Sequence, residues 1–206
     1  MLIEMHVHTV RGSVCSKITP EELVREARSK GLSAVCITEH DFMWEKWSVE
    51  ALTEQAGLRI LQGMEVTTNL GHVLVYGLPQ YLPGIFDLRR LHQMVREHCG
   101  YMVLAHPFRI HWEGHHSISR RVKAALPLVD GVEIVNGSDT KEENQAAYEL
   151  ATRLGLPGIA GSDAHTRWQL GTCVLDFHHL VDGETTLVRE LKAGRYRIVD
   201  RRTGTA

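Results

Sequence analysis

The sequence has no long apolar run, and none of its stretches approaches the roughly 18 residues that a membrane-spanning helix needs. Its first residues lack the basic segment and long apolar stretch of a secretory signal peptide. Cysteine is scarce, with 4 among 206 residues, and no two have the Cys-x-x-Cys spacing of a zinc knuckle or a redox pair. We therefore expect a cytoplasmic protein with reduced, mostly buried thiols and no membrane association.

The chain also lacks a large excess of either charge. Lys and Arg number 23 against 25 Asp and Glu, so the net charge of −2 argues against extended nucleic-acid binding through a broad basic face. Apolar residues make up 43% and charged residues 23%, which is typical of a globular protein and excludes a wholly disordered chain. We expect a single domain over residues 1–200 and a frayed tail at 201–206.

Short β-rich runs alternate with helical patterns along the whole chain. The expected strands are residues 2–7, 33–38, 59–61, 73–76, 101–105, 131–135, 156–160, 172–177 and 196–199. Helices fill several of the gaps, and the first is introduced by a capping box between Thr19 and Glu22. This alternation predicts βαβ units and a mainly parallel sheet, in an α/β fold. A compact, distorted barrel is favoured, and a doubly wound open sheet is the alternative.

Histidine is the residue type that the sequence has in abundance, with 13, as many as Phe, Tyr and Trp together. Several histidines and carboxylates follow expected strands, and the carboxyl ends of parallel strands meet on one face of a sheet or barrel. Seven side chains share this position: His6, His8, His40, Glu65, His106, Asp163 and His165. Partners two residues apart, as in His6 and His8, point to the same side of a strand.

This collection of side chains predicts a site for metal ions. Imidazole and carboxylate groups together suit Zn²⁺, Mn²⁺ or Fe²⁺, and so many ligands indicate two or three divalent ions. A single His-x-His or strand-end histidine is weak evidence, because such residues also occur without metal. Unrelated loop residues, however, are not expected to recur at five equivalent strand ends. Two neighbouring ions can activate water and hold a phosphoryl oxygen.

Taken in order, these motifs resemble those of the PHP (polymerase and histidinol phosphatase) family of metal-dependent phosphoesterases. The matching stretches are EMHVHT, AVCITEHD, GMEVTT, VLAHPFR, GVEIVN and GLPGIAGSDAH, over about residues 2–177. The resemblance implies a distorted, TIM-like (β/α)7 barrel. It also implies a ligand role for each of the seven residues: His6, His8 and Asp163 on a first ion, Glu65 bridging two ions, His106 on a second, and His40 and His165 on a third.

The sequence departs from the family pattern at several positions. Residues 11–16 contain no Asp or His, where many members have a ligand for a third ion, and Cys15 is a candidate substitute. Asn136 stands where some members have a histidine, and it is a candidate for weak metal binding or for orienting substrate. Glu39 replaces a common Asp and is a candidate partner of a ligand histidine. His72 matches a histidine near the cluster in some members, and it is a candidate ligand or proton donor, with a surface position at a strand start as the alternative.

The leading hypothesis is hydrolysis of a small phosphomonoester or a nucleotide-type ester by a metal-bridged hydroxide. Arg109 and Arg167 are candidates to hold the phosphate, and His72 or His165 to protonate the leaving group. One alternative is an amidohydrolase-like C–N or lactone hydrolase, although the strand ends lack the lysine usual at such sites. Another is a non-catalytic, metal-bound PHP module. The expected partner is a small phosphorylated substrate, and the metal identity and oligomeric state stay open.

Overall fold

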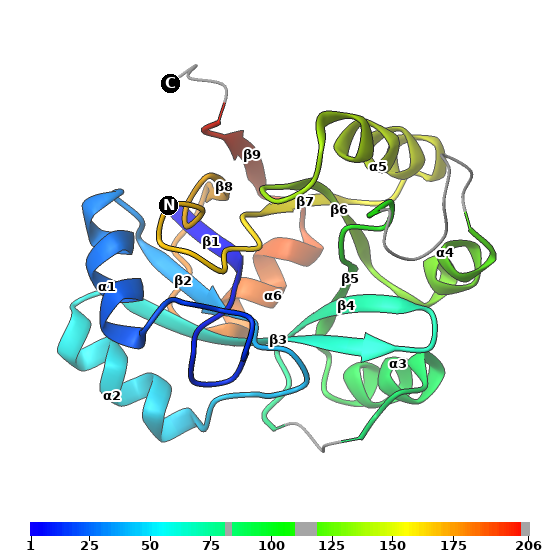
Figure 1. Ribbon diagram of the computed structural model, residues 1–206. Coiled ribbons are helices and arrows are strands. Elements are labelled where there is room, and N and C mark those ends of the chain that lie inside the picture. The colour runs from blue at the N-terminus through cyan, green and yellow to red at the C-terminus, as the bar shows by residue number, and fades with distance from the viewer. Residues whose placement is uncertain (81–83, 110–118, 203–206) are drawn as a thin grey trace.

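The expected strands form one sheet of nine strands within the residues that this computed structural model describes, which are 1–80, 84–109 and 119–202 (Figure 1). In the order β7-β6-β5-β4-β3-β2-β1-β8-β9, the sheet curves into a nearly closed barrel. The strands are β1 (Leu2–Val7), β2 (Ala34–Ile37), β3 (Arg59–Thr68), β4 (Gly71–Tyr76), β5 (Tyr101–Leu104), β6 (Gly131–Asn136), β7 (Gly158–Gly161), β8 (Cys173–Phe177) and β9 (Tyr196–Asp200).

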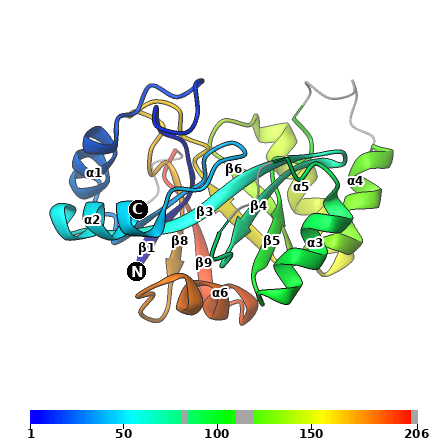
Figure 2. The ribbon, with the colours of Figure 1, turned by 90° about the horizontal axis from the view of Figure 1, so that it is seen from below.

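Six α-helices surround the sheet in the described part of the chain (Figures 1 and 2). They are α1 (Pro20–Ser29), α2 (Lys46–Ala56), α3 (Leu88–Glu97), α4 (Arg120–Ala125), α5 (Lys141–Leu154) and α6 (Glu184–Lys192), and a short 3₁₀ turn, Leu126–Leu128, follows α4. The predicted capping box at the start of α1 is present, with both the Thr19 and the Glu22 hydrogen bonds formed. No helix of the described residues is both long and apolar enough to pass through a bilayer.

The two ends of the sheet approach each other where β1 meets the segment after β7. Val7 pairs with Ala164 in a parallel bridge, and the His8 N–H donates to the Ala164 carbonyl at 3.0 Å. Gly161 makes this approach possible, since a Cβ there would lie 2.4 Å from the Cβ of His6. The distorted barrel is therefore confirmed, in preference to an open sheet.

Two strands depart from the expected parallel arrangement: β8, which is antiparallel to β1 and to β9, and β4. β3 continues to Thr68, well beyond its predicted end, and a tight turn returns the chain as β4, antiparallel to both β3 and β5. The turn is closed by a 2.6 Å hydrogen bond from the Thr68 hydroxyl to the Gly71 carbonyl. In this register Thr67 lies opposite His72, so the alternation of side chains places His72 diagonally across from Glu65 on the same face.

The barrel interior is apolar at one end and polar at the other. Ile3, Met5 and Tyr76 belong to its buried apolar core, together with Leu187 and Leu191 of α6. Figure 2 shows α6 beneath the strands at this end. Because the helix covers the amino-terminal ends of the parallel strands, the opposite, carboxyl-terminal end is left for polar side chains.

The last described residues are attached to the barrel. The Arg201 guanidinium donates to the Lys30 carbonyl, and that of Arg202 donates to the Asn136 carbonyl, each at 3.0 Å. Residues 203–206 of the predicted tail lie outside the described part of the chain. The domain boundary near residue 200 stays a prediction.

Candidate metal centre

The structure brings all seven predicted ligands together at the carboxyl-terminal end of the barrel. His6 and His8 come from the end of β1, His40 follows β2, Glu65 lies within β3, His106 follows β5, and Asp163 and His165 follow β7. Three overlapping groups have ligand atoms within 4.8 Å of one another: His6, His8, Glu65 and Asp163; Glu65, His72 and His106; and His8, His40 and His165. Their role as metal ligands stays a prediction.

The first group has polar atoms that lack a hydrogen-bond partner although they are buried. These atoms are Nε2 of His6, Nε2 of His8 and Oε2 of Glu65, and the two nitrogens each lie 3.3 Å from that oxygen. Asp163 Oδ1 lies 3.5 Å from His6 Nε2 and 3.3 Å from His8 Nε2. Unpaired buried polar atoms are costly, and a cation among these four side chains would satisfy all of them. The donor set therefore fits a divalent ion.

The second group is built around the other oxygen of Glu65. Glu65 Oε1 lies 2.9 Å from His106 Nε2 and 3.0 Å from His72 Nδ1. Glu65 can thus face two ions, one through each oxygen, as expected of a bridging carboxylate. His72 reaches this group because of the β3–β4 hairpin, which the sequence did not predict.

The rear nitrogen of His6 is held by a carboxylate that the sequence analysis did not single out. Glu133 Oε1 lies 2.9 Å from His6 Nδ1. Its Oε2 accepts hydrogen bonds from the backbone N–H of His106 at 3.0 Å and from Asn136 Nδ2 at 2.9 Å. A carboxylate behind a ligand histidine fixes the ring and its tautomer. The signal in the sequence was an acidic residue in the middle of the apolar strand GVEIVN.

The rear nitrogen of His8 is held by a longer chain of hydrogen bonds. His8 Nδ1 lies 3.2 Å from the Ser13 hydroxyl, which donates to Glu39 Oε2 at 2.6 Å. The opposite oxygen of Glu39 accepts from the Trp44 indole N–H at 3.0 Å and from the Thr9 hydroxyl. Glu39 therefore supports a predicted ligand histidine through Ser13.

Backbone conformation also sets this end of the barrel apart. In the described residues, four that are not glycine have positive φ, and three of them are at the site: Asp41 (48°), His106 (27°) and Asp163 (49°). This region is unfavourable for residues with a Cβ, and such strain is concentrated at functional sites. Packing around the strand ends thus holds His106 and Asp163 in place against a conformational cost.

The charges in the cluster are strongly coupled. Burial alone would raise the pKa of Glu65, but the imidazoles of His6, His106 and His40 lower it well below its usual value. Conversely, burial would lower the pKa of His6, whereas the carboxylates of Glu133, Asp163 and Glu65 raise it well above its usual value. In the metal-free protein, protons on the imidazoles thus supply the positive charge that the carboxylates favour.

The two arginines predicted to hold phosphate are placed differently. Arg109 reaches the cluster, where Nη2 lies 2.6 Å from Asp163 Oδ2 and Nε lies 2.8 Å from Asp139 Oδ1. Its guanidinium is thereby paired with carboxylates. Arg167 is exposed, and its guanidinium carbon lies 4.3 Å from the centroid of the Trp168 ring.

The surroundings of Asn136 and Cys15 show whether either residue is placed to replace a missing ligand. Asn136 is buried, and its Oδ1 already accepts hydrogen bonds from Arg109 Nη2 and from the Ser138 N–H, so it orients neighbouring groups. Cys15 is exposed, so it is not one of the buried thiols that the sequence led us to expect, and it belongs to none of the three ligand groups. Among the other free thiols, Cys36 and Cys173 are buried and Cys99 is exposed.

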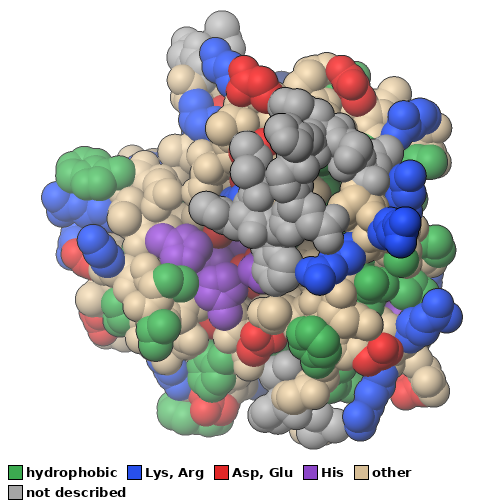
Figure 3. Space-filling model, turned by 45° about the vertical axis from the view of Figure 1, so that its right-hand side comes forward, with side chains coloured by type: hydrophobic (Ala, Val, Ile, Leu, Met, Phe, Trp, Pro, Cys, Tyr) green, Lys and Arg blue, Asp and Glu red, His purple; other side chains and the backbone are tan. Residues whose placement is uncertain are grey.

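The site opens to the surface on the side of His40 and His165. Their side chains are 31% and 25% exposed, whereas those of His6 and His8 are fully buried. Figure 3 shows histidine side chains at this surface. A cleft continues from the second group and is lined by His72, His106, Arg109, Ser119 and Arg121 among others.

Comparison with known proteins places this geometry in a family. The PHP domain matches residues 4–121, and the PHP-associated region matches residues 141–196. The chain therefore belongs to the PHP family. A relative from Methanocaldococcus jannaschii, the uncharacterized protein MJ0417, is 28% identical over 189 residues, which are 87% of this chain and 72% of the relative.

Solved structures share the fold. One is a two-domain protein from Bacteroides vulgatus that contains a predicted PHP-like metal-dependent phosphoesterase; its TM-score is 0.80 at 18% identity, over 97% of this chain and 64% of that one. Another is an amidohydrolase from Chromobacterium violaceum with bound sulfate and no metal, which has a TM-score of 0.64 at 19% identity, over 96% of this chain and 97% of that one. The protein thus has the fold of PHP-type phosphoesterases.

Proposed function

We propose that this protein is a metal-dependent hydrolase of small phosphate esters. The observation that carries the proposal is the convergence of unpaired His6 Nε2, His8 Nε2 and Glu65 Oε2 in a buried site that also contains Asp163. Membership of the PHP family supports the same conclusion. Zn²⁺, Mn²⁺ and Fe²⁺ all suit imidazole and carboxylate donors, so the donor set leaves the choice among them to measurement.

In this proposal the first ion is held by His6, His8, Glu65 and Asp163, and a second by Glu65, His72 and His106. Divalent ions there would supply Lewis-acid stabilisation of the phosphoryl charge and would activate water as the nucleophile. Glu133, Ser13 and Glu39 keep the rings of His6 and His8 in one orientation. Because these supports are buried, little reorganisation is needed when substrate binds.

The remaining polar side chains act on the substrate and on its leaving group. His72 is partly exposed and lines the cleft, so it can either complete the second ion site or donate a proton to the leaving oxygen. Arg109 neutralises Asp163 and Asp139, and it thereby keeps the floor of the cleft from repelling an anion. The sequence prediction of a phosphate contact for Arg167 has no support from its exposed position on Trp168.

The test is phosphate release from a panel of phosphomonoesters and phosphodiesters by protein stripped with a chelator and reloaded with Mn²⁺ or Zn²⁺. We expect turnover only after reloading. Asp163→Ala and His106→Ala should abolish it while circular dichroism shows an intact fold. Full turnover by metal-free protein, or by these variants, would exclude the proposal.

An amidohydrolase-like reaction is the second candidate, because an amidohydrolase shares the fold. None of the seven predicted ligands has a lysine within two residues of it in the sequence, which disfavours a modified-lysine bridge of that class. Amides and lactones in the same panel separate the two reactions. Hydrolysis of those substrates, without phosphate release from any ester, would favour the alternative.

A further inference from the structure

The third group of possible ligands differs from the other two in its donors. His8, His40 and His165 offer three imidazoles and no carboxylate, and His8 also belongs to the first group. Its Nε2 lies 3.3 Å from both Glu65 Oε2 and Asp163 Oδ1, while its Nδ1 lies beside Ser13. An ion in the first group therefore leaves the third group with only the two imidazoles of His40 and His165.

The orientations of the imidazole rings also distinguish the third group from the first two. The lone pair of an imidazole nitrogen lies in the plane of its ring, so two rings can ligate one ion at about 2.0–2.1 Å only where their planes meet at the ion. His6 and His8 are inclined at 58°, and His72 and His106 at 75°, which allows convergence.

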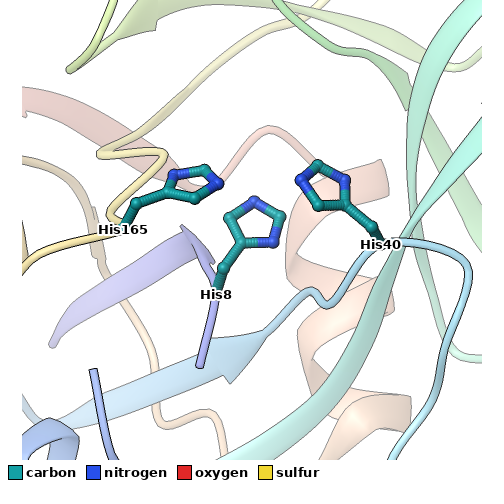
Figure 4. Close-up of side chains that lie close together, drawn as sticks. All are labelled: His8, His40 and His165. Carbon is teal, nitrogen blue, oxygen red and sulfur yellow. The ribbon is translucent and has the colours of Figure 1, made fainter. Parts of the chain in front are cut away.

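The third group has stacked rings instead. Figure 4 shows the His8 ring between those of His40 and His165. Its centroid lies 4.2 Å from that of His40, with 23° between the planes, and 4.3 Å from that of His165, with 27° between the planes. His8 therefore turns the faces of its ring toward the other two, and the rings of His40 and His165 are tilted by 37° with their centroids 5.8 Å apart.

Residues 11–16, where many family members have a ligand for a third ion, do not offer one to His40 and His165. The Ser13 hydroxyl donates to Glu39 and accepts from the backbone N–H of His40 at 3.1 Å, so its hydrogen bonds are already made within the protein. The side chain of Cys15 is exposed. His40 and His165 nevertheless stand on the open side of the cluster, where a substrate would arrive.

We infer that the centre holds two resident ions and that His40 and His165 bind the phosphoryl group of the substrate in place of a third ion. This inference rests on the proposed function. His40 Nδ1 lies 3.0 Å from Glu65 Oε2 and His165 Nδ1 lies 3.1 Å from the Asp163 carbonyl, and neither histidine belongs to the first or second group. The other nitrogen of each ring can donate a hydrogen bond to a phosphoryl oxygen.

The experiment has two readouts that do not depend on turnover. Metal-free protein is saturated with Mn²⁺ or Zn²⁺, passed through a desalting column, and analysed for ions per chain. Inorganic phosphate is then titrated calorimetrically into the loaded protein. We expect about two ions in the wild type and in His40→Asn and His165→Asn, and about one in His106→Asn.

Phosphate affinity should fall about 10-fold or more in His40→Asn and His165→Asn, as expected for loss of a hydrogen bond to a charged group. The variant His98→Asn, at the exposed end of α3, should change neither readout. Three ions in the wild type that fall to two in His165→Asn would overturn the inference but not the proposed function. Two ions in the wild type, together with an unchanged phosphate affinity in His40→Asn and His165→Asn, would also overturn it. No ions in the wild type would instead overturn the proposed function.

Discussion

At the scale of single residues, the site depends on what lies behind the predicted ligands. Glu133 contacts His6 directly, and Glu39 reaches His8 through Ser13. The sequence indicated the histidines because they recur at strand ends. It gave no comparable sign for Glu133, since a hydrogen bond across the barrel joins residues 127 positions apart. Such a contact follows from strand order and register, which local patterns do not specify.

The first prediction concerns Glu133. Replacing it by Gln keeps the size of the side chain but removes the charge that raises the pKa of His6 and fixes the ring. We expect metal affinity to fall by roughly 10- to 100-fold, as for other supporting residues of metal sites. Competition with a fluorescent chelator measures the change. Glu142→Gln, at an exposed position in α5, is the control, and an equal loss there would refute a specific role for Glu133.

The second prediction is a pH dependence of metal binding. Burial would lower the pKa of His8 and of His106, but contacts with Asp163 and Glu65 raise that of His8, and contacts with Glu65 raise that of His106. A raised pKa means that these imidazoles are still protonated above their usual range near 6.5, so a cation must displace protons. Affinity should therefore increase as the pH rises through and beyond 6.5. A titration series from pH 6 to pH 8.5 checks the sign, and constant affinity would contradict it.

At the scale of elements, the alternation of strands and helices was predictable, but the β3–β4 hairpin was not. The capping box of α1 and the strand-end histidines are encoded in neighbouring residues, and both were found in the sequence. The turn at Asn69 and Leu70 has no strong hairpin signal, and β4 is apolar enough to suit either strand direction. Its antiparallel course is set by the tight turn that pairs it with β3 and by pairing with β5 on its other edge.

The third prediction concerns the closure of the barrel. In Gly161→Ala, the new Cβ would meet the Cβ of His6 at 2.4 Å and Glu133 Oε1 at 2.8 Å. The strands must then separate, so we expect a loss of stability of about 1–3 kcal/mol and weaker metal binding. Thermal unfolding and metal titration measure the two effects. Gly183→Ala adds a Cβ in open space and is the control. An equal effect of the two substitutions would contradict the role of Gly161.

At the scale of the whole molecule, the account joins segments from residue 6 to residue 165 into one centre. Each segment arrives at the same end of the barrel, while α6 closes the other end with apolar side chains. Burial of the imidazoles and carboxylates at the open end therefore lowers the stability of the metal-free protein, and bound cations would raise it.

The fourth prediction is that added metal stabilises the whole domain. At a free-ion concentration 100 times the dissociation constant, one bound ion contributes about 2.7 kcal/mol. For a domain of this size, Tm should rise by roughly 5–10 °C with Mn²⁺ or Zn²⁺. Scanning calorimetry of chelated and reloaded protein measures the shift, and Asp163→Asn should greatly reduce it. An unchanged Tm in the wild type would count against a preformed site.

The most direct test is an anomalous difference map from crystals of protein loaded with Mn²⁺ or Zn²⁺. The account predicts a peak about 2.0–2.2 Å from the nitrogens of His6 and His8 and the oxygens of Glu65 and Asp163. Loaded crystals with no peak among these four side chains, or with ions only at the surface, would contradict the central claim.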